Sequence, residues 1–535
     1  MICLGWSLGE SDKKLSGHGS NPSESGATPA SRQLATTHYL RGSSLLLAGR
    51  LVALATNFAV QVLTVRYLAK TDYGAFAYAL AVASMGASIA SLGLNRGVNR
   101  FVPIDHEQKQ YASMFGTMAL ATIAVAGLGL AMVALVVGLG LPDRPGSDDP
   151  LPAGLLLILI GLAPLHALDT LFQGMTATFA TPRALCVRRY LIGPALKLAA
   201  VLVVVLGGGS VRQLAACYVL AGGIGVVLYV MVLYRALKQG GLLDKFPGRR
   251  MVFGVRRLLG FSIPLLSTDL FLTLKVTLAV VILESFRGTT EVADLRAVAP
   301  IAGLCAIVLQ SFKMLFSPTA ARLYARGDRT GLNDLYWRST IWITIATFPV
   351  FCVCFFLAEP VTVLLFGARY HSAGVLLAIL AVGLYFNAAL GLNMYVLQVY
   401  ARVRAITVIN VVAIAVSVGL SFWLIPIHGA LGAATAITLT VVAHNILVQI
   451  GLGLYTDLDV FQPRLLKVYA TIGIGFGVIL VVQKLAWPTV VILATLAVVS
   501  ASLLRVNRTS LAIGDAFPQL ARVPVLARVL GVQRG

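Results

Sequence analysis

Long apolar runs fill most of this chain, and short polar breaks separate them. Each run has about 20 residues, the length at which a helix rising 1.5 Å per residue crosses about 30 Å of hydrocarbon. The approximate ranges are 43–65, 75–95, 112–140, 152–180, 187–206, 212–234, 259–283, 295–317, 337–358, 373–400, 404–426, 428–454, 465–484 and 487–504. The pattern predicts an all-α polytopic membrane protein with about 14 transmembrane helices.

Composition agrees with this fold class. The 535 residues are 58% hydrophobic and only 12% charged, whereas a soluble domain has roughly a quarter charged residues. The six cysteines show no metal-ligand spacing, so we predict neither a metal site nor a bound cofactor. A phosphate-binding Gly-Lys-Ser/Thr loop is also missing, which argues against nucleotide hydrolysis by that route.

The distribution of Lys and Arg predicts the orientation. When the polar breaks are assigned alternately to the two sides, 30 of the 42 basic residues fall on one side and 8 on the other. The positive-inside rule then places both termini in the cytoplasm of a multi-pass protein. The net charge of +21 is therefore mostly a topology signal, and we expect no nucleic-acid partner because no folded domain carries a basic cluster.

A weak internal repeat divides the chain. A shift of 218 residues superposes the start of the first predicted helix on that of the seventh, as in transporters built from two halves with a site near the midplane. We predict two pseudo-symmetric six-helix lobes plus two C-terminal helices. The expected regions are a disordered cytoplasmic tail (1–38), an N-lobe (39–236), a basic cytoplasmic linker (237–258), a C-lobe (259–456), helices 13 and 14 (457–505) and a cytoplasmic tail (506–535).

Six charged residues lie in the interior of predicted spans, away from their ends: Arg50, Asp169, Lys197, Asp269, Lys275 and Lys313. Arg50, Asn57 and Gln61 share one helix face, and Gln310 and Lys313 share another. Polar stripes at this depth face a bundle interior or a water-filled cavity. We expect Arg50, Lys275 and Lys313 to line a cationic cavity suited to an anionic substrate. For Asp169, Lys197 and Asp269, pairing between helices is the competing interpretation.

Four stretches resemble one known family. They are "VLTVRYLAKTDYGAFAYALAVASMGASIASLGLNRGVNRFVP" from Val62, "SPTAARLYARGD" from Ser317, "LLFGARYHSAGVLLAILAVG" from Leu364 and "IPIHGALGAATAITLT" from Ile425. Together they are similar to bacterial polysaccharide-biosynthesis (Wzx-type) flippases of the multidrug/oligosaccharidyl-lipid/polysaccharide (MOP) superfamily. The resemblance runs from about residue 40 to about residue 505.

The resemblance implies a V of two lobes around a cationic cavity lined by helices one, two, seven and eight. It implies a flippase, not an enzyme, that moves an undecaprenyl-diphosphate-linked glycan from the cytoplasmic to the outer leaflet of the bacterial inner membrane. Its partners would be membrane lipids, the polysaccharide polymerase and glycosyltransferases. The substrate-binding residues expected on this basis are Arg50, Asn57, Gln61, Arg96, Arg100, Lys275, Gln310 and Lys313.

Other functions stay open at this point. His166 and Asp169 lie one helical turn apart and could couple transport to H⁺ or Na⁺, although a satisfied interhelical pair is the simpler interpretation. A peptidoglycan-precursor lipid flippase and a cation-coupled drug exporter of the same superfamily are alternatives, the exporter being disfavoured because cations outnumber acids. A membrane-embedded polymerase or glycosyltransferase would need a larger extracytoplasmic loop than residues 141–151.

Overall fold

The fold is helical throughout the part of the chain that the computed structural model describes, which is residues 49–138, 151–459, 462–485 and 487–511. These residues include no β-strand. The predicted tail 1–38, and residues 512–535 of the predicted tail 506–535, lie outside the described residues. Multiple long apolar helices identify a multi-pass membrane protein.

A first helix occupies residues 49–67 of the described chain. The helices that follow it in the first half are α2 (Lys70–Ala90), α3 (Leu94–Glu107), α4 (Tyr111–Gly138), α5 (Leu151–Leu159), α6 (Leu162–Phe179), α7 (Pro182–Cys186), the π-helix η1 (Val187–Ile192), α8 (Gly193–Leu206) and α9 (Val211–Gln239). The predicted basic linker contains two short 3₁₀ turns, η2 (Leu243–Lys245) and η3 (Gly248–Arg250).

The second half begins with a 33-residue helix, α10 (Val255–Arg287). The remaining elements are α11 (Thr289–Ala302), η4 (Gly303–Ala306), α12 (Ile307–Ala325), α13 (Arg329–Phe356), α14 (Ala358–Phe366), η5 (Ala368–Tyr370), α15 (Ala373–Ala389), α16 (Asn393–Val399), α17 (Val403–Tyr455), α18 (Pro463–Lys484), α19 (Thr489–Val506) and α20 (Arg508–Leu511).

Eleven helices in the described residues are long and apolar enough to cross a membrane, or up to twelve if the bent pair α15 and α16 forms one span. The predicted number of fourteen is not confirmed. One reason for the difference is α17, whose 53 residues would reach about 80 Å and are long enough to cross twice.

A sharp break divides α17. Gly429 has φ 56° and ψ −130°, a backbone conformation that only glycine adopts easily. The carboxylate of Glu291 accepts a hydrogen bond of 2.5 Å from the N–H of Ala430, where a new helix begins with its positive dipole end. Arg287 donates to the carbonyls of Pro426 and Ile427, at 2.8 and 3.1 Å. The turn between two crossings is therefore held by the end of α10 and the start of α11.

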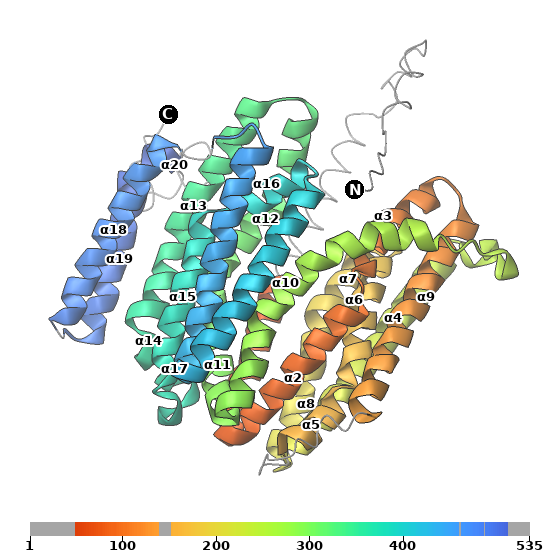
Figure 1. Cartoon of the computed structure of the whole chain (residues 1–535), viewed down its shortest axis with the longest axis horizontal. Helices are drawn as coiled ribbons and strands as arrows, with labels where there is room; N and C mark the ends of the chain where they lie inside the picture. The colour runs from red at the N-terminus through yellow and green to blue at the C-terminus, as the bar shows by residue number, and fades with distance from the viewer. Residues whose placement is uncertain (1–48, 139–150, 460–461, 486, 512–535) are drawn as a thin grey trace, which may run out of the picture.

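The helices form two groups (Figure 1). One group contains α2 to α9 and the other contains α11 to α17, while α10 runs from the end of α3 to the centre of the molecule. α10 contacts α17 most extensively and also packs on α2 and α3. α18 and α19 lie at the outer edge of the second group, against α13. This arrangement corresponds in position to the two lobes and two extra helices that we expected, and we call the groups the N-lobe and the C-lobe.

The lobes meet closely along α2. This helix is rich in Ala and Gly, and Gly74, Ala77 and Ala81 are buried. A Cβ placed on Gly74 would collide with the backbone carbonyl of Thr289, the first residue of α11. Small residues let two helix backbones approach in a membrane, where apolar area gives no net driving force. The end of the molecule at Gly74 is therefore tightly closed.

Polar contacts between the lobes seal the same end. Lys70 forms a 2.7 Å ion pair with Asp294, and these side chains are 21% and 10% exposed. The guanidiniums of Arg66 and Arg369 each donate to the last carbonyls of a helix in the opposite lobe. The acceptors are Leu364 and Leu365 for Arg66, and Val65 and Arg66 for Arg369, at 2.5–2.8 Å. We call these contacts the outer latch, because the predicted topology places them on the extracytoplasmic side.

Candidate functional site

One predicted cation, Arg50, contacts the opposite lobe at the residue that follows a second predicted cation, Lys313. The Nη1 atom of Arg50, on the first helix, lies 3.4 Å from the sulfur of Met314 on α12. Lys313, the preceding residue, places Nζ 4.5 Å from the centre of the Tyr395 ring. Within the described residues neither cation forms an ion pair. Neither charge is therefore neutralised by a carboxylate of the described residues.

The other predicted residues of the first helix have different surroundings. Gln61 donates to the hydroxyl of Tyr73 at 2.6 Å and to the carbonyl of Arg296 at 3.3 Å, which links the lobes near the outer latch. Asn57 donates to the carbonyl of Ala53 on its own helix and lines a cavity inside the N-lobe. The helix face that they share with Arg50 therefore does not open into one site.

Arg96 forms a 2.6 Å ion pair with Asp269, which joins α3 to α10. Asp269 therefore has a structural partner, and it is not the nearby Lys275. The guanidinium of Arg100 lies 4.6 Å from the centre of the Phe261 ring on α10. Both arginines thus hold the first half of α10 against the N-lobe, at the end opposite the outer latch.

Lys275 lies in the C-lobe, where its Nζ is 5.6 Å from the Phe271 ring. It lines a narrow, mostly apolar cavity of 80 Å³ together with Arg296. Gln310 is partly buried on α12. These residues do not join Arg50 and Lys313 in a single cavity of the described chain, so the predicted set is split among several places.

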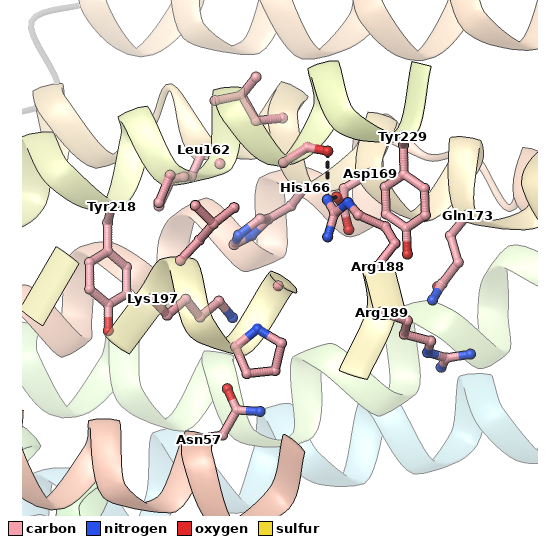
Figure 2. Close-up of a pocket in the computed structure, with 17 residues that line it drawn as sticks. Asn57, Leu162, His166, Asp169, Gln173, Arg188, Arg189, Lys197, Tyr218 and Tyr229 are labelled. Carbon is pink, nitrogen blue, oxygen red and sulfur yellow. Dashed lines mark hydrogen bonds and ion pairs between the residues drawn. The ribbon is translucent and has the colours of Figure 1, made fainter. Parts of the chain in front are cut away.

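A polar cavity of 210 Å³ lies inside the N-lobe, between the first helix, α6, η1, α8 and α9 (Figure 2). The candidate coupling residues His166 and Asp169 line it, as do Arg188 and Lys197. We call it the N-lobe cavity. In the described residues no group of three or more His, Cys, Asp or Glu side chains could hold a metal ion.

An ion pair forms one wall of the N-lobe cavity. Arg188 donates to the carboxylate of Asp169 at 2.8 Å and to the carbonyl of Gly225 at 2.5 Å. Its guanidinium stacks 4.0 Å from the centre of the Tyr229 ring, and its side chain is only 5% exposed. A Cβ on Gly225 would come within 2.9 Å of this guanidinium. Glycine is thus needed for the arginine to reach its carbonyl.

The π-helix η1 places this arginine. Pro194 lacks a backbone N–H, and its ring conflicts with the carbonyl four residues earlier, so regular α-helical bonding cannot continue through it. The chain forms a π-helical turn over Val187–Ile192 instead. Such turns are rare and often occur at functional sites. In this chain the turn carries both Arg188 and Arg189 to the cavity.

Two further cations face the N-lobe cavity without a carboxylate partner in the described residues. Lys197 on α8 and Arg189 on η1 both line it, and both side chains are exposed. Figure 2 shows Lys197 and His166 on one side of the ion pair and Arg189 and Gln173 on the other. Because Asp169 is the sole acid among the lining residues, the formal net charge is +2 when Arg188, Arg189 and Lys197 are counted as charged and His166 as neutral.

A second cavity, of 580 Å³, adjoins the first. It is lined by residues of α3 and α6, including Asn95, Asn99 and His106. Gln173 and Arg189 line both cavities. The two therefore form a polar path that runs from the end of α3, opposite the outer latch, toward the middle of the N-lobe.

The sequence pattern missed three of these cations. Arg188 and Arg189, the second and third residues of the predicted run 187–206, were counted with the cytoplasmic break, yet the helix already begins at Pro182. Arg296 was counted as extracytoplasmic, although it lies two turns into α11. The available signal was Pro194, which marks an irregular turn beside two consecutive arginines.

A family model described as "Polysaccharide biosynthesis protein" matches residues 39–322, which is more than half of the 535 residues. No curated protein has a sequence that matches this chain.

Solved structures share the fold. A multidrug resistance MATE family transporter of the MOP superfamily in an inward-facing conformation aligns with a TM-score of 0.63 at 14% identity, over 77% of this chain and 98% of that one. Lipid II flippase MurJ in an inward closed conformation also aligns at 0.63, with 13% identity, over 89% of this chain and 99% of that one. An outward-facing MATE transporter of the same superfamily aligns at 0.51, with 13% identity, over 78% and 95%.

Proposed function

Because the chain belongs to the polysaccharide biosynthesis protein family, we propose that it is a flippase for a polyprenyl-diphosphate-linked oligosaccharide. It moves this lipid from the cytoplasmic to the outer leaflet of the bacterial inner membrane, with both termini in the cytoplasm. The substrate is a repeat unit made by glycosyltransferases and passed on to a polymerase. The protein changes no covalent bond, so its task is to solvate a charged head group across the membrane.

The observation that carries the proposal is that Arg50 in the N-lobe and Lys313 in the C-lobe form no ion pair in the described residues, and that Arg50 contacts α12 at Met314, next to Lys313. A diphosphate cannot enter hydrocarbon unsolvated, because burial of an unpaired charge costs several kcal/mol or more. Arg replaces water with paired hydrogen bonds, and Lys does so as a point charge. The polyprenyl tail needs no replacement and stays in lipid.

The closed outer latch supports movement by alternating access. With Lys70 and Asp294 joined, the space between the lobes is closed at the outer end, so the substrate would enter from the opposite end. The higher TM-scores to inward-facing and inward closed structures agree with this state. The cycle would then rupture the latch and close the cytoplasmic end.

Coupling to H⁺ or Na⁺ through His166 and Asp169 stays a prediction. Asp169 is bound by Arg188 at 2.8 Å, so a cation could bind there only after that arginine moved. Transport rates measured with imposed proton or sodium gradients test the idea, and rates that do not respond to either gradient contradict it.

The direct test of the proposed function is translocation of a labelled undecaprenyl-diphosphate oligosaccharide in proteoliposomes. The double variant Arg50→Gln plus Lys313→Gln should slow transport by about 100-fold, since each charged hydrogen bond contributes about 1.5–3 kcal/mol. Arg326→Gln, which removes an exposed cation next to α12, is the matched control and should transport normally.

Three results would contradict the proposal. They are equal transport by the double variant and the wild type, transport of lipid II in preference to the polysaccharide precursor, and export of a cationic drug without translocation of either lipid. The second result would indicate a peptidoglycan-precursor flippase, and the third a drug exporter with the same fold.

A further inference from the structure

The N-lobe cavity contains charged side chains that are not needed to bind the diphosphate. It is separate from the contact of Arg50 with Met314, and it lies within one lobe (Figure 2). Its ion pair uses one cation and its only acid, so Arg189 and Lys197 form no ion pair in the described residues, although Glu107 lines the adjoining cavity. Cations kept at membrane depth are costly. An anionic ligand would offset this cost.

Neutral polar groups accompany these cations. The amides of Asn57 and Gln173 line the N-lobe cavity, and those of Asn95 and Asn99 line the adjoining cavity. An amide offers both a donor and an acceptor, which matches a hydroxyl group. A row of amides beside cations is therefore suited to a ligand that has many hydroxyls and also a negative charge.

Shape and depth favour a sugar rather than the lipid head. The cavities measure 210 and 580 Å³ and are joined at Gln173 and Arg189, which gives room for a short oligosaccharide. Lys197 lies 15 residues after Pro182, the start of the helix, so it is about 22 Å along the membrane-crossing direction. The cavity thus extends from one end of the lobe past mid-depth.

We propose that the N-lobe cavity receives acidic sugars of the repeat unit, with carboxylates held by Arg189 on one side of the Arg188–Asp169 ion pair and by Lys197 on the other. This inference rests on the proposed function and narrows it, since it assigns the substrate to the class of uronate-containing glycans. Arg188 is a positioning residue, because its Nη2 atom already donates to both Asp169 and Gly225. The diphosphate stays at Arg50 and Lys313.

Binding to the purified full-length protein tests the inference independently of transport. The probes are a labelled trigalacturonate, a neutral maltotriose of equal length and inorganic pyrophosphate. Trigalacturonate should bind the wild type at least tenfold more tightly than maltotriose, because the neutral sugar leaves both cations unpaired. Arg189→Gln and Lys197→Gln should each weaken trigalacturonate binding by about tenfold or more. Lys197→Arg should retain most of the affinity.

A matched variant separates this inference from the proposed function. Lys313→Gln should weaken pyrophosphate binding and leave trigalacturonate binding unchanged. Equal affinity for the acidic and the neutral trisaccharide would overturn the inference. Unchanged trigalacturonate binding in Lys197→Gln would also overturn it, as would full competition by pyrophosphate, which would assign these cations to the diphosphate. None of these results would change the transport prediction for Arg50 and Lys313.

Discussion

Single residues in the N-lobe cavity are constrained by the arginine at its wall. Gly225→Ala should lower stability by about 1–3 kcal/mol, because the added Cβ would lie 2.9 Å from the guanidinium of Arg188. Thermal unfolding of the detergent-solubilised protein measures this effect. Gly223→Ala is the control on the same helix, since its Cβ would meet nothing within 4 Å. Equal melting temperatures for the two variants would contradict the expected constraint.

Gly429 makes a similar prediction at the break in α17. An alanine there must adopt φ 56° and would collide with the carboxylate of Glu291. We expect a loss of at least about 1–2 kcal/mol from the backbone alone. Gly419→Ala, on the same helix with open space around the new Cβ, should be neutral or stabilising. Thermal unfolding again decides, and a neutral Gly429→Ala would mean that the turn can rearrange.

Intramembrane polar residues could be predicted from the sequence, but their partners could not. Arg50 and Lys313 stand out against apolar neighbours, and the structure places Arg50 against Met314, the residue after Lys313. Asp269 finds its partner in Arg96, 173 residues earlier in the chain. Such a pair depends on how α10 crosses the N-lobe, which no local pattern records. Arg188 was missed for a different reason, because a π-helical turn shifts the start of its helix.

At the scale of helices, the length of an apolar run predicted that a helix exists, but it did not predict the residues at which the helix begins and ends. The run predicted over 337–358 corresponds to α13, but that helix already begins at Arg329. The polar first turns of such a helix extend beyond the hydrocarbon, where water forms hydrogen bonds with both the backbone and the side chains. The pattern separated 404–426 from 428–454, and the sharp break of α17 at Gly429 lies close to that boundary.

Loss of the outer latch should change the distance between helices of the two lobes. Lys70→Ala or Asp294→Asn should destabilise the closed outer end by roughly 2 kcal/mol, a factor of about 30 in the ratio of closed to open states. Spin labels at Arg212 on the N-lobe and Thr290 on the C-lobe, both exposed, should then report a longer distance. The exchange of the two charges, Lys70→Asp with Asp294→Lys, should restore the closed distance.

A control for the latch lies within one helix. Arg338 and Asp334 form a 2.9 Å pair on α13, with both side chains 51% exposed. Asp334→Asn should leave the distance between the labels unchanged, because exposed pairs contribute little and this pair does not join the lobes. A similar lengthening in this variant would show that the labels respond to charge and not to the latch.

At the scale of the molecule, the orientation can be tested at two exposed cations. With the native cysteines replaced, Arg326→Cys, in the connection between α12 and α13, and Lys484→Cys, at the end of α18, should lie on opposite sides. A membrane-impermeant thiol reagent should label position 484 in intact spheroplasts and position 326 only in inside-out vesicles. The reverse pattern would invert the proposed direction of transport.

In the outer latch, Arg66 and Arg369 each bind carbonyls of the opposite lobe, and these contacts affect how the interface is hydrated when it opens. Arg66 and Arg369 occupy carbonyls that water would otherwise hydrate, so separation of the lobes must bring in water for both guanidiniums and all their acceptors together. The barrier to opening is then partly a hydration barrier. We expect excluded osmolytes outside the membrane, which favour the less hydrated state, to slow transport in proportion to the water activity that they remove, and transport measured across a sucrose series would show it.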